Sequence, residues 1–157
     1  MKTDYLKLAA SILIPLAAGF LGAFFTTPSI ATWYAALQKP LFSPPNWIFG
    51  PVWTILYVLM GLSMYMVWTG GENKSKSGAF TLFGTQLFLN VLWSIIFFGM
   101  KSPFYAFIEI IVLWIAIILT IRNFQNISKT AALLLIPYVL WVSFAAVLNY
   151  SIFVLNP

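Results

Sequence analysis

The 157-residue sequence contains no cysteine and no histidine, and its only acidic residues are Asp4, Glu72 and Glu109. These absences exclude disulfides, thiolate nucleophiles, iron–sulfur clusters, zinc sites of the usual kind, histidine-ligated haem and imidazole general bases. With only three acidic residues, the chain has almost no pair of carboxylates that could act together as general acid and base. Charged residues make up 7% of the chain, against roughly 25% in a soluble domain. The composition therefore disfavours a soluble enzyme with conventional acid–base or nucleophilic chemistry.

The sequence is rich instead in apolar residues (62%) and aromatic residues (18%), and its mean hydropathy is +0.95. A transmembrane helix needs about 20 apolar residues, and it must pair its backbone polar groups internally. Five runs meet this length, at 6–25, 51–69, 79–99, 103–121 and 130–153. We therefore expect one all-α domain over 1–157, a polytopic membrane protein built as a five-helix transmembrane bundle. Pro15 and Pro137 predict kinks inside two of these runs.

The basic residues predict how the bundle is oriented in its membrane. One side of the bilayer would carry six of them, and the other would carry only Lys39 and Lys101; the six are Lys2, Lys7, Lys74, Lys76, Arg122 and Lys129. The positive-inside rule then puts the N-terminus inside and the first loop and C-terminus outside. We expect an integral protein of a bacterial cytoplasmic (inner) membrane. Basic residues scattered in this way form no patch for nucleic acid, which is not expected as a partner.

The first loop, 26–50, is long and aromatic, and it contains Pro40, Pro44 and Pro45. Proline limits the freedom of such a loop, and the stretch 30–38 has neither proline nor glycine and could form a short helix. A stiff aromatic loop beside a bilayer is either an interfacial anchor or a lid over a cavity. The composition alone leaves both interpretations open.

Polar and aromatic residues share one face on three of the expected helices. These faces carry Trp53, Tyr57 and Gly61; Gln86, Asn90, Trp93, Ser94 and Phe97; and Tyr138, Trp141, Ala145, Leu148 and Asn149. Such stripes face the bundle interior, where they either line a pocket or only hydrogen-bond one helix to another. If Trp33, Tyr34 and Trp47 of the first loop cap them, the three faces enclose an aromatic pocket with few charges.

Three features have two interpretations each. Lys39 is either a solvated interfacial lysine or a partner for a ligand carboxylate. Glu109, the only acid within a span, is either a functional intramembrane carboxylate or a group that is hydrated or bonded to an indole near the interface. The small-residue pairs Ala18/Gly22 and Gly19/Ala23 serve either internal packing or a dimer contact.

Several motifs together resemble the translocator protein family, the tryptophan-rich sensory proteins related to the peripheral-type benzodiazepine receptor. The first reads Trp33-Tyr34-x-x-Leu37-x-Lys39-Pro40, followed by Pro44-Pro45-x-Trp47-x-Phe49-x-Pro51-x-Trp53-x-x-Leu56-Tyr57. The others are Gln86-x-x-x-Asn90-x-x-Trp93-Ser94-x-x-Phe97-Phe98 and Leu135-x-Pro137-Tyr138-x-x-Trp141-x-x-Phe144-Ala145-x-x-Leu148-Asn149. The resemblance covers essentially the whole chain.

The resemblance implies a membrane receptor or carrier, commonly a homodimer, that binds tetrapyrroles such as protoporphyrin IX and haem, or other flat hydrophobic molecules, beneath the first loop. The porphyrin or haem would be a ligand, and no cofactor is required. The alternative function is light-dependent porphyrin degradation through Trp53 and Trp141. Candidate ligand-binding residues are Trp33, Tyr34, Trp47, Trp53, Tyr57, Asn90, Trp93, Ser94, Tyr138, Trp141, Ala145 and Leu148. The basic residue of the sterol pattern expected after Tyr150 is missing, which argues against selective sterol binding through that pattern.

Overall fold

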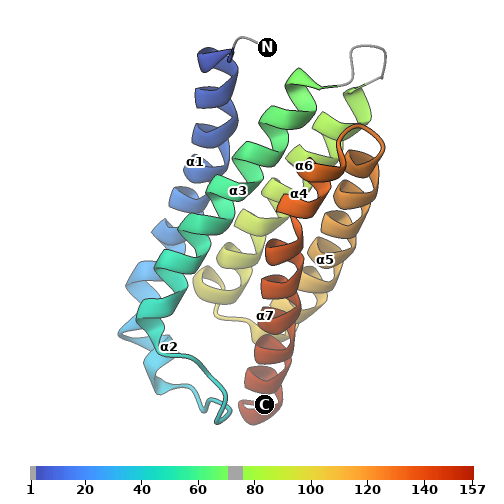
Figure 1. Ribbon diagram of the computed structural model, residues 1–157. Coiled ribbons are helices and arrows are strands. Elements are labelled where there is room, and N and C mark those ends of the chain that lie inside the picture. Colours follow the sequence, from blue (N-terminus) through green and yellow to red (C-terminus); the bar gives the residue numbers. More distant parts are fainter. Residues whose placement is uncertain (1–2, 71–75) are drawn as a thin grey trace.

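The computed structural model describes residues 3–70 and 76–157, and this part of the chain is an all-helical bundle (Figure 1). Its elements are α1 (Tyr5–Ile30), α2 (Trp33–Ala36), the 3₁₀ turn η1 (Asn46–Ile48), α3 (Phe49–Thr69), α4 (Ser77–Ser94), the π-helical turn η2 (Ile95–Gly99), α5 (Pro103–Gln125), α6 (Lys129–Leu134) and α7 (Ile136–Leu155). Five helical segments are long and apolar enough to cross a membrane: Tyr5–Ile30, Asn46–Thr69, Ser77–Gly99, Pro103–Gln125 and Lys129–Leu155. The expected fold class is confirmed.

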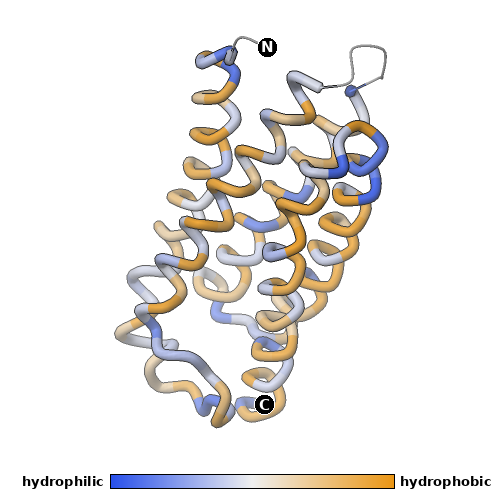
Figure 2. Tube along the Cα trace, viewed as in Figure 1, coloured by the Kyte–Doolittle hydropathy of each residue, from blue (hydrophilic) through white to orange (hydrophobic). Residues whose placement is uncertain are grey.

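The five spans form a closed ring. Helix α1 packs against α3 and α4, α5 packs against α4 and α7, and α6 closes the ring by packing against both α3 and α5. The start of α1 and the α5–α6 connection lie at one end, while the first loop and the C-terminus lie at the other (Figure 1). Hydrophobic residues cover the length of the helices, and hydrophilic residues gather mainly near the ends (Figure 2). Among the basic residues that predict orientation, Lys2 and Lys74 lie outside the described residues.

The first loop is shorter than expected at both ends. Helix α1 continues to Ile30, and residues 46–50 already belong to η1 and α3, so the connection that the sequence placed at 26–50 covers only 31–45. In this added part of α1 the Thr26 hydroxyl donates to the Gly22 carbonyl at 3.0 Å, and the buried Ser29 hydroxyl ties the last turn to η2 by donating to the Phe98 carbonyl at 3.0 Å. The short helix expected within 30–38 is present as α2.

The last span is broken at Leu135, next to Pro137. Proline has no N–H group and disrupts the turn before it, so the carbonyls of that turn lose helical partners. The Leu135 amide donates to the Ala132 carbonyl, and the Ala131 carbonyl accepts a 2.7 Å hydrogen bond from the Ser63 hydroxyl of α3. The kink expected from Pro137 is thus present as a break, and a carbonyl that the break frees in α6 accepts a hydrogen bond from α3.

Close contact between α1 and α3 depends on Gly61. A Cβ added there would lie 2.6 Å from the Ile12 Cα and 2.8 Å from the Ser11 carbonyl oxygen, both of which are backbone atoms of α1. Because these atoms move only if the whole helix moves, the site has no room for a side chain.

We expect Gly61→Ala to lower the free energy of unfolding by about 1–3 kcal/mol, the usual cost of overpacking. The measurement is the thermal unfolding midpoint in detergent. Gly84→Ala is the matched control, because Gly84 is exposed on α4 and an added Cβ meets nothing within 4 Å. Equal midpoints for the two variants would contradict the packing described for α1 and α3.

Candidate functional site

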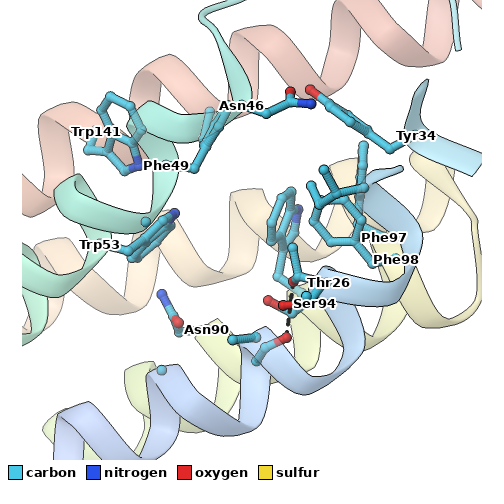
Figure 3. A pocket seen from close by; sticks show the side chains of 18 of the residues that line it. Thr26, Tyr34, Asn46, Phe49, Trp53, Asn90, Ser94, Phe97, Phe98 and Trp141 are labelled. Atoms are coloured by element: carbon cyan, nitrogen blue, oxygen red, sulfur yellow. Dashed lines mark hydrogen bonds between the residues drawn. The ribbon is translucent and has the colours of Figure 1, made fainter. Parts of the chain in front are cut away.

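A cavity of about 430 Å³ lies between α1, α3, α4 and α7, beside the first loop. Its volume falls within the roughly 300–1,000 Å³ of small-molecule sites. Trp53, Trp141 and Phe49 stand on one side of it and Tyr34, Phe97 and Phe98 on the other (Figure 3). The remaining lining residues are Leu16, Gly19, Phe20, Gly22, Ala23, Thr26, Thr27, Ile30, Asn46, Gly50, Thr54, Tyr57, Asn90, Trp93, Ser94, Ala145, Leu148, Asn149 and Ile152.

The cavity brings together nine of the twelve candidate binding residues. These nine are Tyr34, Trp53, Tyr57, Asn90, Trp93, Ser94, Trp141, Ala145 and Leu148. They come from the first loop and from the three helix faces that the sequence placed together. Their role in ligand binding remains a prediction.

The other three candidates do not line the cavity. The Trp33 ring packs edge-on against Phe97, with centroids 5.6 Å apart, so it supports a lining residue from behind. The side chain of Trp47 is 73% exposed on the outer surface. Tyr138 is fully buried, and its hydroxyl is used in hydrogen bonds between helices. The expected cap of Trp33, Tyr34 and Trp47 is therefore reduced to Tyr34, joined by Asn46.

Sequence reasoning missed the wall that α1 contributes. Phe20, Ala23, Thr26 and Thr27 line the cavity, and so do Gly19 and Gly22 of the small-residue pairs. A Cβ added at Gly19 would meet the Tyr57 ring, and one at Gly22 would lie 3.1 Å from the Ser94 hydroxyl. Between internal packing and a dimer contact, these two glycines therefore serve internal packing. The only sequence signal for this wall was the pattern of small residues.

A chain of hydrogen bonds links α3, α4 and α7 next to the cavity. The Tyr57 hydroxyl donates to Asn90 Oδ1 at 2.6 Å, and Asn90 Nδ2 donates to the Tyr138 hydroxyl at 3.2 Å. The Tyr138 hydroxyl in turn donates to Gln86 Oε1 at 2.8 Å. Tyr57 and Asn90 also line the cavity, so the polar stripe of α4 serves both purposes that the sequence left open: it holds helices together and contributes to the wall.

Two indole N–H groups of the lining differ in their partners. Trp93 Nε1 donates to Asn149 Oδ1 at 3.0 Å, and Asn149 Nδ2 donates to the Pro103 carbonyl at 2.8 Å. Trp141 Nε1 is buried and has no hydrogen-bond partner within the described residues. A buried donor without a partner is rare in proteins.

The cavity lining contains no charged residue in the part of the chain that the structure describes. Lys39 Nζ donates to the carbonyls of Ala35 and Leu37 and lies 4.7 Å from the centroid of the Tyr34 ring. Lys39 thus stabilises the first loop and does not line the cavity. Glu109 is buried and also lies outside the lining. Neither carboxylate oxygen has a hydrogen-bond partner among the described residues, so the bond to an indole, one of the possibilities that the sequence left open, is not found there.

The first loop is fastened to the C-terminal end of α7. The Gln38 amide donates to Asn156 Oδ1 at 2.9 Å, and Asn156 Nδ2 donates back to the Gln38 carbonyl at 2.9 Å. The Phe42 ring also packs edge-on against Phe144 of α7, with centroids 6.4 Å apart. Tyr34 of α2 is only 3% exposed, and its burial raises the pKa of its hydroxyl above the ordinary value. The loop therefore closes the cavity at this end with a neutral phenol.

We expect Tyr138→Phe to lower the free energy of unfolding by about 1 kcal/mol, because it leaves the buried Asn90 and Gln86 amides each short of a partner. The thermal midpoint in detergent measures this loss. Tyr150→Phe removes the same hydroxyl from a side chain that is 50% exposed and serves as the control. A midpoint unchanged from wild type in Tyr138→Phe would mean that the hydrogen-bond chain contributes nothing to stability.

Comparison with known proteins confirms the resemblance seen in the motifs. The TspO/MBR family matches residues 11–155. A tryptophan-rich protein TspO of Archaeoglobus fulgidus is 53% identical over 154 residues, covering 98% of this chain and 99% of the relative. One from Chlorobaculum tepidum is 46% identical over 158 residues, covering 100% of both chains. The translocator protein of Bos taurus is 38% identical over 152 residues, covering 96% and 90%. With its five apolar spans, this integral membrane protein belongs to the TspO/MBR family.

Proposed function

We propose that this protein is a membrane receptor or carrier that binds tetrapyrroles, such as protoporphyrin IX and haem, as ligands in the cavity beside the first loop. The observation that carries the proposal is the pair of aromatic walls, with Trp53 and Trp141 facing Tyr34 and Phe97 across an open space (Figure 3). Aromatic contacts contribute about 0.5–1.5 kcal/mol each beyond the area they bury. A wide, flat, aromatic ligand can make the largest number of these contacts with both walls.

The uncharged lining determines how such a ligand would lie. An ionised carboxylate is costly to bury without a partner, and the described lining offers no cation. The macrocycle would therefore occupy the cavity while its propionates stay at the mouth, at the level of the lipid headgroups. Haem would be held by contacts between its ring and the aromatic walls, and not by the histidine or cysteine ligand of many haem proteins, since the chain has neither residue.

The membrane setting belongs to the same proposal. We propose a bacterial cytoplasmic membrane, with the N-terminus inside and the first loop and C-terminus outside, from the distribution of lysine and arginine. We also propose a homodimer, as the family resemblance implies. Gly19 and Gly22 contact Tyr57 and Ser94 within the same chain, so the dimer surface is expected elsewhere.

Ala145→Phe tests the proposed site, because Ala145 lines the cavity and a phenyl group there would occupy the space of the macrocycle. We expect the Kd for protoporphyrin IX, measured by titration of its absorbance in detergent, to rise about tenfold or more, equivalent to about 1.4 kcal/mol. Ala17→Phe on the exposed side of α1 is the control and should bind as wild type does. Equal affinity of the two variants would place porphyrin outside the cavity.

A second candidate function is light-dependent degradation of the bound porphyrin. It is favoured by the position of Trp53 and Trp141, two oxidisable indoles that both line the cavity. The light-excited pigment and dioxygen would supply the oxidising chemistry. Illumination of the complex should bleach porphyrin absorbance faster than in free solution, and Trp53→Phe with Trp141→Phe should remove the acceleration. Equal bleaching with and without protein would contradict this activity.

A further inference from the structure

We infer that the ligand passes between the cavity and the bilayer sideways, through a gap between α1 and α3 in the leaflet beside the first loop, and not under the loop itself. This inference rests on the proposed function, because it names the route to the same cavity. The route also implies the class of ligand, which is a molecule already dissolved in the membrane.

Surface exposure of the lining residues shows where the cavity opens. Phe20, Ala23 and Thr27 share one face of α1, and Gly50 and Thr54 lie in the first turns of α3. All five line the cavity and are exposed on the outer surface, Phe20 by 75%, and the same holds for Asn46 of η1, one turn before Gly50. Residues that are both lining and exposed mark the point where a cavity reaches the surface. Because both helices span the membrane, this surface faces lipid.

The contacts between α1 and α3 explain why a gap exists here. The two helices approach closely at Gly61, beside Ile12, and at Gly19, beside the Tyr57 ring. Nearer to the first loop the cavity separates the two helices. Gly50, in the first turn of α3, lies on the α3 side of this gap. A Cβ added at Gly50 would meet nothing within 4 Å, so the gap has free space at that position.

The route under the first loop is closed by contrast. It would require breaking the two hydrogen bonds between Gln38 and Asn156 and separating the Phe42 and Phe144 rings. It would also expose Tyr34, whose ring packs 5.7 Å from that of Phe98. The gap between α1 and α3 requires no such rupture.

This geometry selects a planar amphiphile. Such a molecule lies in the leaflet with its apolar ring among the acyl chains and its charged edge at the headgroups. It can slide edge-on between α1 and α3 without carrying its carboxylates across the uncharged lining. Water-soluble anions gain no such access.

The first experiment measures the association and dissociation rates of protoporphyrin IX by stopped flow with protein in vesicles. We expect Gly50→Leu to lower the association rate constant about tenfold without raising the dissociation rate, whereas Asn156→Ala and Gly84→Leu should associate as wild type does. Faster association in Asn156→Ala, together with an unchanged rate in Gly50→Leu, would place the route under the loop and overturn the inference.

The second experiment does not depend on porphyrin, so the route can fail while the proposed function stands, and the reverse. The chain has no cysteine, and Ala145→Cys therefore places a single thiol in the cavity. In proteoliposomes, a lipid-partitioning pyrene maleimide should label it faster than a membrane-impermeant charged maleimide, and adding Gly50→Leu should slow that labelling. Preferential labelling by the charged reagent, accelerated by Asn156→Ala, would contradict a lateral route.

Discussion

Polar groups within the hydrocarbon of a membrane have no water to bond, so they must find partners inside the protein. Tyr57, Asn90, Tyr138 and Gln86 meet that constraint by hydrogen-bonding one another across α3, α4 and α7. Glu109 and the Trp141 N–H do not, since neither has a partner among the described residues. Because the amides and phenols need one another, the three helices are held at a set distance at this level. The cavity lies beside that layer, and Tyr57 and Asn90 belong to both. The same contacts thus stabilise the fold and shape the site.

The two ends of the bundle are built differently. Toward the N-terminal end, Gly61 lets α1 and α3 touch, and Ser63 bonds the carbonyl of Ala131 in α6. Toward the first loop, bulky rings replace these close contacts: the π-helical turn η2 carries Phe97 and Phe98 into the lining, and Tyr34 covers them. A packed end and a hollow end within one bundle give a firm base to the cavity, whose opening between α1 and α3 we propose to face lipid.

Sequence reasoning predicted the five spans and the three inward faces, because hydropathy and helical spacing both report burial directly. It placed Trp53, Asn90 and Trp141 correctly on the cavity side, since polar and aromatic residues in a lipid helix turn inward. It could not find the α1 wall, because exposed residues such as Ala23 and Thr27 carry no burial pattern. Nor could it find the bond between Gln38 and Asn156, which joins a backbone group to a side chain 118 positions away. Loop aromatics were the least predictable: Trp47 lies on the outer surface, and tryptophan is common both in aromatic pockets and at membrane–water interfaces.

The central claim is that a flat pigment lies between the aromatic walls, and fluorine NMR of protein labelled with 5-fluorotryptophan tests it most directly. A porphyrin shifts the resonances of nuclei near its ring through its ring current. On addition of protoporphyrin IX, the resonances of Trp53, Trp93 and Trp141, which line the cavity, should shift strongly. Those of Trp68 and Trp114, on other surfaces of the bundle, should stay in place. Shifts confined to Trp68 or Trp114, or no shift at the three cavity tryptophans, would contradict the claim.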